Sequence, residues 1–281
     1  MKSLHKKFDQ RENDNGTSSY DPEESSKNEE IKKEKMDPAF YYAVPVILCV
    51  HIISSFFGLA FPFYELIPEL ECMTTSGVWA SWSKEMACTT PSNYRVDWNS
   101  RYSIVNLMTE NDLICEEDYK IGMLGAVVFF GFVLSAFTIM PLPDILGRKP
   151  VLIVTTIIST LMAITFMFLK NINHMYIALF IFGFTVLVRG TTSYVYLLEI
   201  VPEHYEKRVV MTLSMIEKMQ VTLIPLWFYI LRDWRYQVSI FLIVSSIGAV
   251  YLFWIPESPK FMKNKQQEQR NLKLRKEYSD R

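Results

Sequence analysis

Residues 121–169 read IGMLGAVVFFGFVLSAFTIMPLPDILGRKPVLIVTTIISTLMAITFMFL. Two apolar segments, 121–142 and 151–169, flank a short turn that carries an acidic and two basic residues, and neither apolar part contains Lys, Arg, Asp or Glu outside that turn. Each segment approaches the roughly 20 helical residues that cross a bilayer core of about 30 Å. Backbone polar groups must be satisfied within the segment in lipid, which favours helices. The stretch therefore predicts two membrane-spanning helices joined by a tight charged turn.

Four further segments have the same length and apolar character. Only two of the six segments carry Lys, Arg, Asp or Glu: the fourth contains Arg189, and the fifth contains Glu217 and Lys218. Continuous apolar runs of this length differ from the alternating pattern of a membrane barrel. The sequence thus predicts an all-α membrane protein with six transmembrane helices at 40–64, 121–142, 151–169, 175–197, 209–231 and 236–255.

The remaining residues are polar and divide the chain into regions. We expect a charged, flexible tail at 1–39, a membrane domain at 40–262 with a long loop at 65–120 between the first two helices, and a charged tail at 263–281. The formal net charge is -1, so the chain has no global basic field for nucleic acid.

Basic residues predict the orientation in the membrane. Twenty of the 29 Lys and Arg residues lie in the two tails and in the links after the second and fourth helices, whereas seven lie in the other links. By the positive-inside rule, both termini face the cytoplasm, or the matrix in a mitochondrion. The long loop faces the opposite side.

Acidic and basic residues gather at the predicted inner ends of the helices. Such a set can form a pairing network that locks helix ends together and acts as a conformational latch. A purely structural role, or a loop that only carries positive-inside charges, is equally compatible with the spacing. The members are Asp144, Gly147, Arg148, Lys149, Glu199, Arg208, Glu257 and Lys260.

An ordered series of motifs resembles the N-terminal six-helix half of an organic cation/anion transporter of the major facilitator superfamily. The resemblance runs from about Cys72 to Met262. It implies half of a twelve-helix fold, built as a 3+3 inverted repeat, with a substrate pathway between the two halves. The matching segments are Thr109–Cys115, the turn with Asp144, Gly147, Arg148 and Lys149, the pair Gly183 and Glu199, Asp233–Arg235, and Pro256–Pro259.

The chain departs from this family pattern at four positions. Met140 stands where the turn motif opens with Gly, Ile145 where an Arg follows the Asp, and Leu179 where the fourth helix carries an Arg. Lys260 replaces an Arg and supplies a point charge in place of a bidentate fork. These departures predict that part of the family's gating machinery is eroded.

Length and departures together lead to two hypotheses about function. The 281 residues supply six helices and hence one wall of the pathway. We expect a half-size, non-transporting accessory or structural subunit of a larger membrane complex, for which a respiratory-chain complex is one candidate host. The alternative is an organic-ion transporter that acts as a homodimer or with a separate second half. The expected partners are the lipid bilayer and either other membrane subunits or a second half-transporter chain.

Polar side chains within the predicted helices are candidates for a substrate pathway or for intramembrane contacts. A charged side chain at this depth faces the bundle interior or water and has a partner. This applies to Arg189, Glu217 and Lys218, and His51 adds a group that titrates near neutrality. For His51 and Arg189, hydrogen-bonded core positions are the competing interpretation.

Three cysteines, Cys72, Cys88 and Cys115, lie in the long loop, where an oxidising compartment allows one disulfide whose pairing the sequence leaves open. The sequence contains no metal-ligand spacing, cofactor motif or enzyme signature, so we expect no metal, no cofactor and no enzymatic activity. The predicted outward loop has no Asn-x-Ser/Thr sequon, which favours a compartment without glycosylation. We therefore expect the mitochondrial inner membrane, with the plasma membrane as the alternative.

Overall fold

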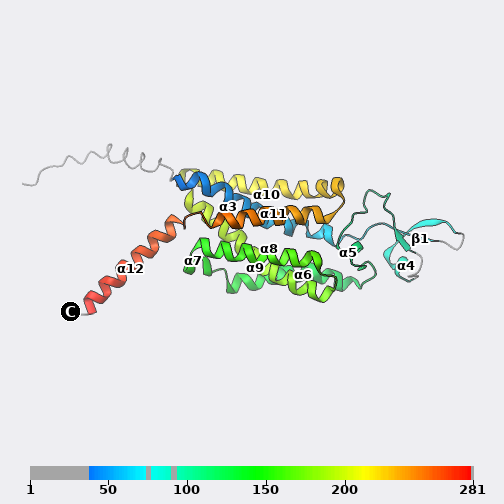
Figure 1. Ribbon diagram of the computed structural model, residues 1–281, viewed down its shortest axis with the longest axis horizontal. Helices are drawn as coiled ribbons and strands as arrows, with labels where there is room; N and C mark the ends of the chain where they lie inside the picture. Colours follow the sequence, from blue (N-terminus) through cyan, green and yellow to red (C-terminus); the bar gives the residue numbers. More distant parts are fainter. Residues whose placement is uncertain (1–37, 74–76, 90–93, 280–281) are drawn as a thin grey trace, which may run out of the picture. The chain divides into compact units, whose positions relative to one another are not determined.

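The computed structural model describes residues 38–73, 77–89 and 94–279. Six of its helices are long and apolar enough to cross a membrane. They are α3 (Pro38–Tyr64), α6 (Asp118–Thr138), α8 (Arg148–Phe168), α9 (Ile172–Ile200), α10 (Glu203–Leu231) and α11 (Trp234–Leu252). The predicted all-α membrane architecture with a long loop after the first helix is thus confirmed (Figure 1).

The six helices pack side by side as a bundle (Figure 1). Helix α9 contacts α6, α8 and α3, whereas α11 contacts α3 and α8, and α10 contacts α3. Because the chain crosses the bundle six times, α3 begins and α11 ends at the same end, here called the tail end. The opposite end, where the connection from α3 to α6 lies, is called the loop end.

Aromatic side chains fill the half of the bundle interior nearest the loop end. Phe57 lies at the centre, with ring centroids 4.4 Å from Phe182 and 5.4 Å from both Tyr64 and Phe241. Trp234 is 1% exposed and its ring meets those of Tyr64 and Phe166. Large fully buried rings of this kind contribute much of the apolar area that holds α3, α8, α9 and α11 together.

Two glycines allow α6 and α9 to approach closely. A Cβ atom on Gly131 would lie 2.6 Å from the carbonyl oxygen of Phe180, and one on Gly183 would lie 2.3 Å from that of Val128. No side chain fits at these distances, so the backbones of the two helices are in direct contact. Small residues at such crossings are typical of membrane helix packing.

The connection between α3 and α6 contains a small antiparallel sheet and two short helices. The strands β1 (Leu70–Met73), β2 (Trp79–Trp82) and β3 (Tyr94–Val96) pair in the order β2-β1-β3, with Cys72 opposite Ala80 on one side and Tyr94 on the other. The short helices are α4 (Lys84–Thr89) and α5 (Leu107–Glu110). A disulfide joins Cys88 to Cys115, so the structure takes one of the pairings that the sequence leaves open and places Cys72 as a buried free thiol.

Backbone hydrogen bonds attach this connection to the loop end of the bundle. The amide of Val105 donates to the carbonyl of Arg232 at 2.8 Å, and the amide of Trp234 donates to the carbonyl of Val105 at 3.1 Å. The indole of Trp234 and the guanidinium of Arg235 both donate to the Glu110 carboxylate. The turn between α10 and α11 therefore holds the connection in place.

Two boundaries differ from the sequence-based expectation. Helix α10 begins at Glu203, two turns before the predicted apolar segment, so Lys207 and Arg208 lie within the helix and not in a link. Residues Pro259–Ser279 form one continuous exposed helix, α12, where a solvated, partly helical tail is expected. The expected N-terminal tail lies outside the described residues except for the start of α3.

Candidate functional site at the tail end and in the bundle

The short helix α7 (Leu142–Leu146) meets α8 at Gly147, and the geometry of this turn requires glycine. Gly147 has φ +112°, a conformation that side-chain-bearing residues rarely adopt. A Cβ atom there would lie 2.7 Å from Oε2 of Glu257. The absence of a side chain thus lets the Glu257 carboxylate approach the start of α8.

Glu257 caps the N-terminus of α8 from a distant part of the sequence. Its Oε1 accepts hydrogen bonds from the backbone amides of Arg148 at 2.9 Å and Lys149 at 3.1 Å, and from that of Ser258 at 3.0 Å. The first amides of a helix have no partner within the helix, and the N-terminal end of the dipole favours a negative charge. This carboxylate therefore links the segment after α11 to α8.

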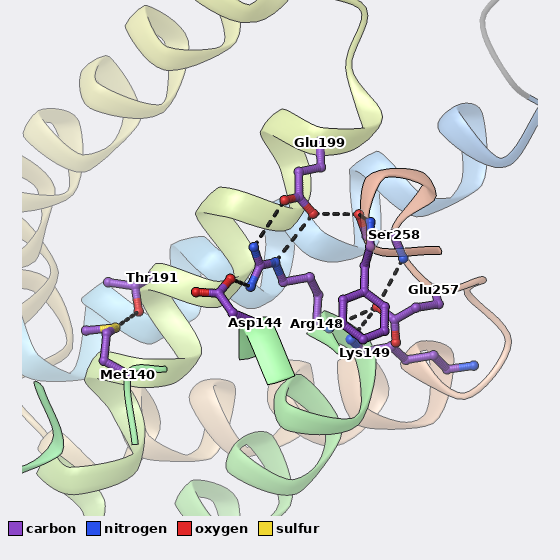
Figure 2. Close-up of polar contacts among 9 residues, drawn as sticks. Met140, Asp144, Arg148, Lys149, Thr191, Glu199, Glu257 and Ser258 are labelled. Atoms are coloured by element: carbon purple, nitrogen blue, oxygen red, sulfur yellow. Dashed lines mark hydrogen bonds and ion pairs between the residues drawn. The ribbon is translucent and has the colours of Figure 1, made fainter. Parts of the chain in front are cut away.

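Arg148 connects α7, α8 and α9 (Figure 2). Its guanidinium pairs with Asp144 and reaches both oxygens of Glu199, with Nη2 to Oε1 at 3.1 Å and Nε to Oε2 at 3.4 Å. The Ser258 hydroxyl, which is fully buried, donates to Oε2 of Glu199 from the other side. Bidentate pairing of this kind is directional and holds the two helix ends in one geometry.

Two further contacts tie the segment after α11 to the tail end of the bundle. The Lys149 ammonium donates to the carbonyl of Phe253 at 2.8 Å, and the Tyr196 hydroxyl donates to the carbonyl of Pro256. Together, Asp144, Arg148, Lys149, Glu199, Glu257 and Ser258 are here called the tail-end network. The network joins the ends of three helices to the segment that leads into α12.

A cavity of about 520 Å³ lies between α3, α6, α9 and α10. Its lining is mostly apolar and aromatic and includes Phe129, Phe132 and Tyr194. Two titratable groups meet there, because the Glu217 carboxylate accepts from or pairs with Nε2 of His51 at 3.1 Å. The Glu217 side chain is 42% exposed whereas that of His51 is 9% exposed, so the carboxylate is the group presented to the cavity.

The other ring nitrogen of His51 is held by α9. Nδ1 lies 3.2 Å from the carbonyl of Gly190 and 3.1 Å from the Ser193 hydroxyl. One helix turn further along α10, the Gln220 amide donates to the carbonyl of Ile52 and accepts from the Ser55 hydroxyl. Polar contacts therefore join α3 to both α9 and α10 beside the cavity.

Glu65 borders this region at the loop end. It directly follows α3, and its Oε1 is buried without a hydrogen-bond partner among the described residues. A Cβ on Gly125, which lines the cavity, would be 3.6 Å from that oxygen. Burial raises the pKa of Glu65 from 4.5 to about 7, and a backbone hydrogen bond from Gly125 opposes part of this rise.

The profile of one protein family matches this chain over residues 100–279, which is more than half of its length, and that family is the Major Facilitator Superfamily. The chain belongs to the Major Facilitator Superfamily. It is therefore a transporter-like integral membrane protein, and the resemblance drawn from the motifs is confirmed.

Similar proteins include an organic cation/carnitine transporter and members of solute carrier family 22. The human organic cation/carnitine transporter 2 is 30% identical over 161 residues, which cover 56% of this chain and 28% of the human protein. Mouse solute carrier family 22 member 4 is 27% identical over 159 residues, covering 56% of this chain and 28% of that protein. Bovine solute carrier family 22 member 1 is 23% identical over 171 residues, covering 60% and 30%. The aligned part of the chain thus corresponds to less than a third of the length of each relative.

Of the eight residues predicted to form a charge network, the structure brings six together and places two apart from them. Asp144, Gly147, Arg148, Lys149, Glu199 and Glu257 come together at the tail end. Arg208 does not join them, since it is exposed on α10 and lies over the ring of Tyr205 at 5.6 Å. Lys260 is exposed at the start of α12, and no ion pair involves it within the described ranges.

The intramembrane candidates also separate. His51 and Glu217 form the pair in the cavity, and Lys218 is exposed on the neighbouring face of α10. Arg189 does not line the cavity; it is fully buried between α3, α8 and α9, where Nε donates to Ser54 at 2.8 Å and Nη1 to Ser159 at 2.6 Å. The intramembrane-contact interpretation of Arg189 is the one that this position favours.

Sequence reasoning missed the hydroxyl groups of the site. Ser258 and Glu257 both lie within the Pro256–Pro259 motif, but only Glu257 carries a charge that predicts a role in the network. Ser54, Ser159 and Ser193 carry no charge and no motif, so only the packing of the helices shows that they hold Arg189 and His51. A group of three or more His, Cys, Asp or Glu residues with metal-binding geometry does not occur among the described residues.

Proposed function

We propose that this six-helix unit forms one wall of a membrane pathway for an organic cation. The cavity between α3, α6, α9 and α10 carries this proposal, because it lies within the membrane-spanning part and presents one carboxylate among apolar and aromatic side chains. An organic cation needs an apolar surface for its body and an anionic or aromatic group for its charge. Glu217 supplies the anionic group and Tyr194 supplies an aromatic ring.

The names of the relatives support the same substrate class. The human protein is an organic cation/carnitine transporter, and the mouse and bovine proteins are members of solute carrier family 22. We infer that a quaternary ammonium compound such as carnitine or tetraethylammonium is a suitable probe. The chain covers 28% of the human relative, so the remaining wall of the pathway would come from further residues or from another chain.

The tail-end network would act in this pathway as a latch. Arg148 and Glu257 bind helix ends that are far apart in the sequence, and they do so through ionic and backbone hydrogen bonds. Packed elements switch between discrete arrangements, and polar pairs at an interface bias which arrangement is populated. Breaking the Arg148–Glu199 pair would therefore change the balance between open and closed states at the tail end.

Uptake of radiolabelled tetraethylammonium into cells that express the full chain tests the transport proposal. Replacing Glu217 with Gln removes the cavity carboxylate and is expected to lower uptake at least about tenfold, since one lost charge contact costs more than about 1.4 kcal/mol. The matched control is Glu203→Gln, an exposed carboxylate at the start of the same helix. Wild-type uptake equal to that of mock-transfected cells, with normal surface expression, would refute transport by this chain.

A second candidate function is that of a non-transporting accessory or structural subunit in a larger membrane complex. Three positions favour it, since Met140, Ile145 and Leu179 replace glycine or arginine of the transporter pattern. Leu179 is 1% exposed within the apolar core, so this site no longer offers a charge. Ile145 is 71% exposed on α7 and offers no charge either.

Native purification followed by mass spectrometry distinguishes the two functions. A stoichiometric set of membrane subunits together with absent uptake supports the accessory role, whether the host is a respiratory-chain complex or another assembly. A homodimer, or a complex with a second six-helix chain, supports transport. We propose that the protein is located in the mitochondrial inner membrane or, alternatively, in the plasma membrane, with both termini on the matrix or cytoplasmic side. Imaging of a tagged chain identifies the membrane.

A further inference from the structure

We propose that Arg189, Thr156 and Thr192 enclose a binding site for a monatomic anion of the size of chloride, between α8 and α9. The site is separate from the cavity and from the tail-end network, and the inference does not depend on the proposed function. It rests on three buried polar atoms that have no hydrogen-bond partner in the part of the chain that the structure describes: Nη2 of Arg189 and Oγ1 of both threonines.

The charge of Arg189 is the first observation. The residue is fully buried, and its guanidinium contacts two serine hydroxyls and the face of Phe241, whose ring centroid is 5.5 Å from Cζ. No carboxylate forms an ion pair with Arg189 within the described part of the chain. A buried unpaired guanidinium costs several kcal/mol unless a negative charge lies beside it. An anion supplies that charge, whereas a water molecule does not.

The threonines are the second observation. Thr155, directly beside Thr156 on α8, donates to the carbonyl of Val151 at 2.7 Å, and Thr191, beside Thr192 on α9, donates to that of Leu187 at 2.9 Å. Such bonds to the preceding turn are how helical threonines in lipid normally satisfy their hydroxyls. Thr156 and Thr192 are 1% and 3% exposed and make no such bond. Both hydroxyls are thus free to donate to a ligand.

The register of the two helices brings these groups to one level. Arg148 contacts Glu199 at one end of the antiparallel pair, and Arg189 contacts Ser159 near its middle. Thr156 precedes Ser159 by three residues, and Thr192 follows Arg189 by three residues. At a rise of about 1.5 Å per residue, both threonines lie about 4.5 Å from that contact in the same direction. The two threonines therefore lie at one level of the helix pair, about one turn from the contact between Arg189 and Ser159.

The donor set fits a small anion. A guanidinium N–H and two hydroxyls are donors, and an acceptor that meets all three must be negative or have several lone pairs. Ser54, Ser159 and Ser245 surround the same region from α3, α8 and α11, and each of them already has a partner. Arg189, Thr156 and Thr192 are 0%, 1% and 3% exposed, so a small anion without an organic part, a halide, is the matching class.

Unfolding of the purified full chain in detergent tests the site. At constant ionic strength, sodium chloride is expected to raise the unfolding midpoint saturably relative to sodium gluconate, because ligands of the native state stabilise it. Thr156→Val and Thr192→Val are expected to lose most of this shift. Thr155→Val is the matched control, since it removes an adjacent buried hydroxyl that is already bonded, and it should keep the shift.

A crystal grown in sodium bromide provides the second measurement. An anomalous peak within hydrogen-bond distance of Nη2 of Arg189, absent in Thr156→Val, supports the site. Equal midpoints in chloride and gluconate together with no bromide peak would overturn it. The same conclusion follows if water alone fills the position, or if the chloride-dependent shift is identical in all three threonine variants.

Discussion

Gly147 shows how one residue position sets the geometry of the tail end. Its φ of +112° and the 2.7 Å approach of Glu257 leave no space for a side chain. Gly147→Ala is expected to strain the backbone and to displace the carboxylate from the start of α8, lowering the free energy of unfolding by roughly 2 kcal/mol or more. Denaturation of the purified protein in detergent measures this change.

Gly77→Ala is the control for this substitution. Gly77 has φ +78°, but none of the described residues lies within 4 Å of the added Cβ. It is expected to cost about 1 kcal/mol, from backbone strain alone. If the two variants lose equal stability, the Glu257 contact contributes nothing and the importance of Gly147 is conformational only.

Glu65 predicts a pH dependence of stability. Its pKa in the folded protein is about 7 against an ordinary value of 4.5, so the folded state binds the proton more tightly than the unfolded chain. The stability that this proton contributes is present below the unfolded value and is lost as the pH rises through about 7. Glu65→Gln stays neutral, so its unfolding midpoint should exceed that of the wild type at about pH 8, and the two should converge toward about pH 5.

The exposed Glu69 gives the comparison for Glu65. Glu69→Gln removes an exposed carboxylate from the same connection and is measured beside Glu65→Gln as its control. A constant offset between Glu65→Gln and the wild type across this pH range would contradict a buried titrating carboxyl.

For single residues, charge and motif in the sequence were enough to predict the charged members of the tail-end network, whereas contacts that depend on helix packing were not predictable. Asp144, Arg148, Glu199 and Glu257 are visible in the sequence because charged residues next to apolar runs are rare. Arg189 is visible for the same reason, but its burial between serines depends on which face of α9 meets α8 and α3. Hydroxyl groups have no such signal, and so the roles of Ser258 and Ser159 follow only from the fold.

At the scale of helices, glycines bring the backbones of α6 and α9 into contact where the two helices cross. Gly183→Ala would place a methyl group 2.3 Å from the carbonyl oxygen of Val128, and the two helices must separate to admit it. The expected loss is about 1–3 kcal/mol of unfolding free energy, as for other overpacked sites. Gly122→Ala is the control on α6, because its Cβ would meet nothing within 4 Å. Equal stability of both variants would mean that the helices are not in backbone contact.

The element boundaries were predictable where lipid imposes them and less so elsewhere. Apolar runs of about 20 residues located all six helices because the bilayer thickness sets their length. Helix α10 begins earlier than its apolar run, since Glu203 and Glu206 near a helix N-terminus favour the helix although they are charged. The strands β1 to β3 have three or four residues each, too few to show an alternating pattern.

For the whole molecule, six crossings predict that the start of α3 and the helix α12 lie on one side of the membrane and the connection with the disulfide on the other. Single cysteines introduced at the partly exposed Ser100 and at the exposed Lys273 in intact cells check this. A membrane-impermeant maleimide is expected to label position 100 only, and position 273 only after permeabilisation. Labelling of both positions in intact cells would contradict the odd number of crossings, by α6, α8, α9, α10 and α11, that separates them.

The bonds that Glu257 accepts have a consequence for how this protein tolerates sequence change. Its partners at the start of α8 are main-chain amides, which every residue except proline provides. Drift at positions 148 and 149 can therefore alter their side chains without breaking this contact, whereas replacement of Glu257 removes both bonds at once. Across natural variants, we expect positions 147 and 257 to be the more constant pair, and position 149 to vary among residues other than proline.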